Sequence, residues 1–135
     1  MQDISNDSVK TFFDEWNVDI NGVKTACEIL LTTMASFSGV KLVFLHRPGI
    51  SFSVRMLPSD NQEKIIALLD IIDDAPEERW ASLCFDASRI VDVEELGDLV
   101  PQGLQGYDAC CFDYDKEDMG FLAYLKARLQ ESVAV

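Results

Sequence analysis

Hydrophobic and polar residues follow two different periods along the chain, and these periods separate the expected helices from the expected strands. Apolar residues recur at helical spacing in four stretches, which predicts helices near residues 8–16, 23–37, 60–74 and 116–131. Four other stretches, rich in β-branched, aromatic and other apolar residues, predict strands near residues 40–46, 50–57, 80–86 and 107–114. One short helical turn is expected in residues 93–100, before Pro101.

These elements give the order α-α-β-β-α-β-β-α, which predicts an α+β fold in one domain over residues 1–135. The first two strands are joined by the short segment Arg47-Pro48-Gly49, which permits only an antiparallel hairpin. The third and fourth strands are apolar at nearly every position, as expected for central strands that are covered on both faces. We therefore expect an antiparallel sheet of four strands, or slightly more, with helices packed on at least one face.

The helical stripes and the strand faces together predict a hydrophobic core. Its expected members are Phe12, Phe13, Leu30, Met34, Phe44, Phe52, Val54, Ile66, Leu69, Cys84, Cys111, Phe112, Leu122 and Leu125.

The loop length of the first hairpin decides which side chains share a face. A three-residue loop of Arg47, Pro48 and Gly49 places Phe44 opposite Phe52, and one face is then apolar throughout. A two-residue loop of Pro48 and Gly49 mixes polar and apolar side chains on both faces. Gly49 suits the longer loop because it adopts a left-handed conformation, whereas Pro48 counts against it by disfavouring a helical Arg47. Burial of one face favours the three-residue loop.

The predicted hairpin lies in a part of the chain without acidic residues. The whole chain has 24 acidic and 11 basic residues, yet the charged or titratable side chains of residues 29–59 are only Lys41, Arg47, Arg55 and the single histidine, His46. The favoured register places Lys41 opposite Arg55, and such a like-charge pair costs a few tenths of a kcal/mol or more. We therefore predict that Lys41, His46, Arg47 and Arg55 bind a ligand or a partner.

Three kinds of negative group can offset the charge of the hairpin. The first is an acid of the same chain, with Asp86, Asp108 and Asp113 as candidates; the second is an acid of a partner subunit, and the third is a free anion. Arg55 is the expected central contact, because its planar guanidinium binds a carboxylate through two hydrogen bonds. A basic hairpin on an otherwise acidic molecule also suits self-association.

Composition excludes several classes of partner. A formal net charge of −13 would repel nucleic acid over most of the surface and favours binding to a basic protein surface. No stretch approaches the ~18 uninterrupted apolar residues of a membrane span, so no membrane association is expected. The polar N-terminus, "MQDISNDS", does not resemble a signal peptide, so a cytoplasmic location is expected.

The four cysteines are interpreted as small buried hydrophobic residues, since no CxxC motif is present. Cys110 and Cys111 are adjacent in a strand and point to opposite faces, so they cannot easily bond to each other or share a metal. The acidic run "DYDKED" lacks the glycine and the final glutamate of a calcium loop. We expect no metal, no cofactor and no catalytic residue, although the sequence leaves open whether the protein is an enzyme.

Two functions from different classes remain open. The first is a small acidic non-enzymatic protein-interaction module, expected to be a homodimer or another homo-oligomer, with a basic protein as a further possible partner. It resembles secretion chaperones and toxin-immunity proteins in size, charge and element order only. The alternative is a small-molecule anion-binding or enzyme domain with a pocket beside the 40–57 hairpin.

Overall fold

The computed structural model describes residues 7–60 and 63–134. The helices are α1 (Asp7–Asp14), α2 (Lys24–Ser36), the short 3-10 helix η1 (Ala87–Arg89) and α3 (Met119–Val133). The strands are β1 (Val40–Arg47), β2 (Ser51–Pro58), β3 (Ala67–Ile72), β4 (Trp80–Asp86), β5 (Asp98–Leu104) and β6 (Tyr107–Tyr114).

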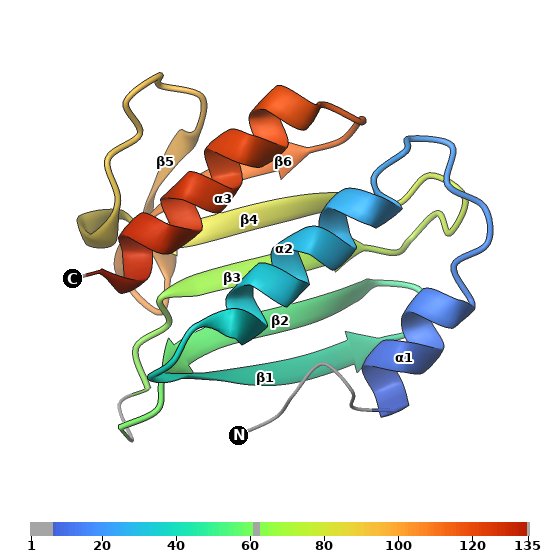
Figure 1. Cartoon of the computed structure of the whole chain (residues 1–135), viewed down its shortest axis with the longest axis horizontal. Coiled ribbons are helices and arrows are strands. Elements are labelled where there is room, and N and C mark those ends of the chain that lie inside the picture. Colours follow the sequence, from blue (N-terminus) through green and yellow to red (C-terminus); the bar gives the residue numbers. More distant parts are fainter. Residues whose placement is uncertain (1–6, 61–62, 135) are drawn as a thin grey trace.

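The strands form one six-stranded sheet in the order β1-β2-β3-β4-β6-β5. Every neighbouring pair of strands is antiparallel. Figure 1 shows α1, α2 and α3 together on one face of this sheet. The α+β class, the antiparallel sheet and the hairpin of the first two strands are therefore confirmed.

The helix predicted for residues 60–74 is wrong, because this segment contains strand β3. Buried Ala67, Leu69 and Ile71 alternate along the strand with half-buried residues, which are Leu68, Asp70 and Ile72. The isoleucines and leucines of this segment fit a helical stripe as well as a strand, and pairing with both β2 and β4 selects the strand. A helix over 60–74 would begin with a capping box of Ser59 and Gln62, and Gln62 lies outside the described residues.

The helical turn predicted for residues 93–100 is also wrong, since β5 begins within it. Asp92 instead accepts hydrogen bonds from the amides of Leu96 (3.1 Å) and Gly97 (2.8 Å), which folds the segment into a turn. Pro101 is tolerated in β5 because this strand lies at the edge of the sheet.

The core lies between the helices and the sheet. Of the predicted core residues, all are buried except Phe44, Cys84 and Cys111, which are half-buried. Phe52 is fully buried and stacks on Phe12, with 4.6 Å between the ring centroids. The third and fourth predicted strands, at residues 80–86 and 107–114, correspond to β4 and β6. The prediction that both of their faces are covered is wrong, because β4 alternates between buried and half-buried residues.

Candidate functional site

The β1–β2 hairpin turns through Pro48, Gly49 and Ile50. The amide of Ile50 donates a 2.9 Å hydrogen bond to the carbonyl oxygen of Arg47, and Gly49 has a φ of 79°. Proline followed by a glycine with positive φ is typical of a type II turn. Arg47 then pairs with Ser51, so the loop has the predicted odd length but lies one residue further along the chain.

This displacement moves every predicted partner by two residues and leaves the division into faces unchanged. Lys41 lies opposite Leu57, and Arg55 lies opposite Val43. The predicted juxtaposition of Lys41 and Arg55 is therefore wrong. The prediction that one face of the hairpin is apolar is confirmed, because the alternation of side chains depends on the parity of the loop and not on its position.

The structure places three of the four predicted site residues on the same face of the hairpin, spread along its length. Lys41, Arg47 and Arg55 lie on the face of the sheet that is turned away from the helices. His46 lies on the helix face, where its ring centroid is 5.4 Å from that of Phe12 and 5.3 Å from that of Phe52. A site that uses Arg55 and His46 together is therefore not formed.

We call the face turned away from the helices the open face. On the hairpin it carries Lys41, Val43, Leu45, Arg47, Ser51, Ser53, Arg55 and Leu57. On the remaining strands it carries Leu68, Asp70, Ile72, Trp80, Ser82, Cys84, Asp86, Asp98, Val100, Ala109, Cys111 and Asp113. Two of its apolar side chains, Val43 and Leu45, are 38% and 39% exposed. The open face therefore offers apolar area beside charged groups.

Polar side chains form a row across the middle of the open face. The strand register places Ser53, Asp70, Ser82 and Asp113 side by side on β2, β3, β4 and β6. The Ser53 hydroxyl donates a hydrogen bond to the carboxylate of Asp70. Burial raises the pKa of the Asp113 carboxyl, and the neighbouring carboxylates of Asp98 and Asp115 raise it further.

One end of the open face is covered by the chain itself. Ile65 and Leu104 pack with Leu57 and Ala109 in a small second hydrophobic cluster. The side chain of Gln105 holds the segment around Ile65 in place. It accepts a 2.7 Å hydrogen bond from the Ile65 amide and donates one to the carbonyl oxygen of Glu63. The uncovered area consequently lies toward the hairpin turn and the middle of the strands.

Asp86 was expected as a counter-charge for the basic hairpin, but it binds other cations. Its carboxylate lies 2.9 Å from the ammonium group of Lys64 and 3.9 Å from the guanidinium of Arg89. Burial alone would raise the pKa of Asp86, but hydrogen bonds from Lys64 and Ser88 outweigh burial and lower the pKa. Asp86 is therefore already neutralised within its own chain.

The two other acid candidates do not neutralise the hairpin either. Asp108 accepts a 3.1 Å hydrogen bond from the amide of Gln102, and Asp113 lies on β6, three strands away from β2. Within residues 7–60 and 63–134, no ion pair involves Lys41, Arg47 or Arg55. An acid of the same chain, the first of the three predicted counter-charges, is thus not seen in the described structure.

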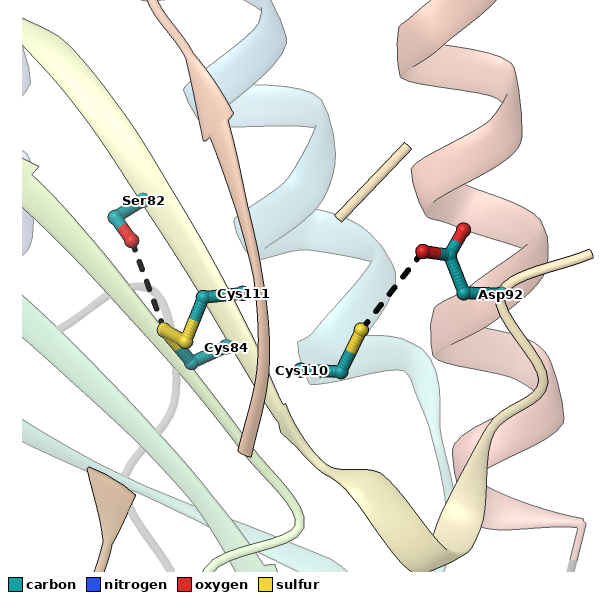
Figure 2. The surroundings of a disulfide bond; sticks show 5 residues. All are labelled: Ser82, Cys84, Asp92, Cys110 and Cys111. Carbon is teal, nitrogen blue, oxygen red and sulfur yellow. Dashed lines mark hydrogen bonds between the residues drawn. A yellow bond between two sulfur atoms is a disulfide. The ribbon is translucent and has the colours of Figure 1, made fainter. Parts of the chain in front are cut away.

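Cys84 and Cys111 form a disulfide bond on the open face. They lie directly opposite each other on β4 and β6, and the Ser82 hydroxyl lies 3.6 Å from the Cys84 sulfur. Figure 2 shows Cys110 pointing to the other side of β6, toward Asp92. The interpretation as small buried hydrophobic residues is therefore wrong for Cys84 and Cys111, which are half-buried and bonded to each other. Their pairing depends on the register of β4 and β6, which the sequence pattern did not define.

The remaining two cysteines are free and buried on the helix side. Burial raises the pKa of the Cys27 thiol, and the nearby carboxylates of Asp19 and Glu28 raise it further. Burial also raises the pKa of Cys110, assisted by the carboxylates of Asp92 and Asp98. Both thiols are therefore held in the protonated, unreactive form.

An acidic pocket of about 520 Å³ lies beside the N-terminus of α3. Its lining residues include the acidic Glu94, Asp113 and Asp118 and the aromatic Phe121 and Tyr124. Neither this pocket nor three further ones lined by described residues includes any of the four predicted site residues.

No group of histidine, cysteine and acidic side chains in the described ranges has the arrangement of a metal site. Among the helices of those same ranges, none combines the length and the apolar character that a transmembrane span requires. In comparisons with known proteins, no protein-family model, no curated protein and no solved structure matched the chain.

Proposed function

We propose that this chain is a non-enzymatic protein-interaction module that binds its partner with the open face of the sheet. The observation that carries the proposal is the placement of α1, α2 and α3 on the opposite face. A sheet normally buries its apolar faces against another layer, and here Val43 and Leu45 remain exposed. A protein partner would supply the missing layer.

The charges of the open face support a protein partner. Lys41, Arg47 and Arg55 have no ion-pair partner within the residues that the structure describes. Acidic side chains of a bound protein would offset these charges and orient the complex, while the apolar side chains supply contact area.

Site-specific photo-crosslinking tests the proposal. A benzophenone amino acid at Leu45 is expected to give a discrete covalent adduct with another polypeptide in the native cells. The matched control is the same residue at Val18, which is 48% exposed and lies outside the sheet. Absence of an adduct at Leu45, or an equal pattern at Val18, would overturn the proposal.

A small-anion site is the second candidate, because the same unpaired cations could bind a phosphate or carboxylate. Such a site would use Arg47 and Arg55 without His46, which lies on the other face. Thermal unfolding with millimolar phosphate or citrate separates the two functions. A rise in the melting temperature that is lost in Arg55→Gln supports the anion site, and an unchanged melting temperature supports the protein partner.

We also propose a location, for which two observations point in opposite directions. The N-terminal sequence favours the cytoplasm, whereas the Cys84–Cys111 disulfide favours an oxidising compartment, because disulfides are rare in the cytosol. The cytoplasmic location is retained as the proposal. Rapid alkylation of thiols in intact cells tests it: reduced Cys84 and Cys111 support the cytoplasm, and a protected pair contradicts it.

A further inference from the structure

We propose that the partner on the open face is a second copy of this chain, related to the first by a two-fold axis parallel to the strands. This inference rests on the proposed function, because it names the occupant of the same surface. It is carried by the distribution of charge across the face, by the symmetry of a dimer and by the apolar residues near its centre.

The first step is the change in the sign of the charge across the open face. At the β1–β2 side the face carries Lys41, Arg47 and Arg55, and at the β6–β5 side it carries Asp113 and Asp98. Neither of these two aspartates forms an ion pair with any residue that the structure describes. The surface thus has a basic half and an acidic half, whose charges are unpaired within the described chain.

The second step is symmetry. In a two-fold dimer, residue i of one subunit contacts residue j of the other, and residue j contacts residue i. An axis along the strands reverses the strand order of the upper sheet, so that β2 lies over β6 and β1 lies over β5. The same axis keeps each residue at its height along the strands, and the register places Arg55 level with Cys111. Asp113 lies two residues further along β6, so the long side chain of Arg55 reaches it diagonally, twice per dimer. An axis across the strands would instead place like charges together.

The third step concerns the centre of the interface. The same axis places β3 over β4, where the open face carries Leu68, Ile72 and Trp80 together with the disulfide. All of these side chains are half-buried in the single chain and therefore retain area for contact. Apolar contact between two sheets about 10 Å apart is the arrangement of a β-sandwich.

The size of the open face limits the area that two copies can bury against each other. Six strands about 4.8 Å apart, with about six residues of about 3.3 Å on each, give a projected area of roughly 480 Å². The accessible surface that two interdigitating faces bury exceeds this flat area, and a standard interface buries roughly 800 Å² on each partner. Affinity depends on the central contacts and on charge complementarity more than on area, so we expect a reversible dimer whose dissociation constant responds to the charges at positions 55 and 113.

Charge exchange between two variants tests the inference. Arg55 and Asp113 are exposed and have no ion-pair partner within the described chain, so Arg55→Asp and Asp113→Arg should both fold. Each variant alone opposes like charges twice in its dimer. We expect sedimentation equilibrium to show a dissociation constant raised by about 10- to 30-fold in each.

An equimolar mixture of the two variants provides the decisive measurement. In the heterodimer, the aspartate introduced at position 55 of one subunit lies diagonally opposite the arginine introduced at position 113 of the other, within reach of its long side chain. The second contact joins the unchanged Arg55 to the unchanged Asp113, so the affinity should return to near that of the unchanged chain. Such rescue in trans cannot come from contacts inside one subunit. Lys10→Asp, a like change of charge on exposed Lys10 of α1, is the control and should leave the dimer intact.

Three results would overturn the inference: a monomer at all concentrations, a dimer that neither variant weakens, or weakened variants that the mixture does not restore. These results leave the proposed function to its own test, since an adduct at Leu45 with a different polypeptide would still support it. An adduct at Leu45 with a second copy of the chain supports both.

Discussion

The guanidinium of Arg79 donates a 2.6 Å hydrogen bond to the carboxylate of Asp73, and both residues are more than nine-tenths buried. The pair closes the connection between β3 and β4. The same guanidinium lies 4.8 Å from the ring of Phe12 and 5.2 Å from the ring of Trp16. This one cation therefore joins α1 to the end of the sheet through an ion pair and two aromatic contacts.

Substitution of Asp73 should strongly destabilise the fold. Asp73→Asn leaves the buried guanidinium of Arg79 without its counter-charge, and breaking a buried pair costs about 3–5 kcal/mol. Urea unfolding measures the loss. Asp74→Asn is the matched control, because Asp74 is exposed next to the pair and should lose less than about 0.5 kcal/mol. Equal unfolding midpoints for the two variants would show that the pair contributes nothing to stability.

Truncation of Phe52 tests the division of the hairpin into faces. Phe52 is fully buried on the helix face, so Phe52→Ala should lower the free energy of unfolding by about 3–5 kcal/mol. Phe44→Ala, at a half-buried position on the same face, should cost distinctly less. A midpoint that barely moves for Phe52→Ala would contradict the burial of Phe52 on the helix face.

The disulfide predicts a redox-dependent stability. Cys84 and Cys111 are 27 residues apart in the chain, and closing a loop of this length is worth about 3–4 kcal/mol in the chain-entropy estimate. Dithiothreitol should therefore lower the urea midpoint of the unchanged chain. The double variant Cys84→Ser, Cys111→Ser should start at the lower midpoint and should not respond to dithiothreitol. A response in the double variant would assign the effect to other thiols.

Acid should weaken the segment that follows η1. Burial alone would raise the pKa of Asp92, but hydrogen bonds from the Tyr124 hydroxyl and from the amides of Gly97 and Leu96 outweigh burial and lower the pKa. A lowered pKa in the folded state means that the contribution of Asp92 to stability is fully present above its unfolded pKa of about 3.9. This contribution is lost as the pH falls through the folded pKa.

Urea unfolding between pH 6 and pH 2 measures this loss, with Asp92→Asn as the test variant. The variant should be less stable than the unchanged chain at pH 6, and the difference should shrink below about pH 4. Asp115→Asn, at an exposed position just before α3, is the control. A difference that stays constant with pH would contradict the assignment to the Asp92 carboxylate.

The sequence predicted correctly which face of the hairpin each side chain lies on, but it did not predict which residues of the two strands lie opposite each other. Alternation of apolar and polar residues placed Phe52 in the core and put Lys41, Arg47 and Arg55 on one surface. The two-residue displacement of the hairpin was not predictable in this way, because a shift of two preserves the alternation. It follows instead from the hydrogen bond between Ile50 and Arg47, which alternation does not specify.

Other features depend on contacts between distant segments. The run from Ile65 to Ile72 fits both periods, and only its two neighbouring strands decide that it is a strand. His46 and Arg47 are adjacent in β1, so their side chains point to opposite faces and His46 lies on the helix face. The predicted strand already implied this arrangement, but the predicted site combined the two residues. The Cys84–Cys111 bond needed the pairing of β4 with β6, which periodicity does not give.

The disulfide has a consequence for the connectivity of the molecule. Because it joins Cys84 to Cys111, the segment with η1, the turn held by Asp92 and all of β5 forms a closed covalent ring. A protease that cuts once inside this ring, for example at exposed Val93, cannot separate the molecule into two pieces. The nicked protein would migrate as a single band until a reductant opens the ring, and only then would the two fragments part.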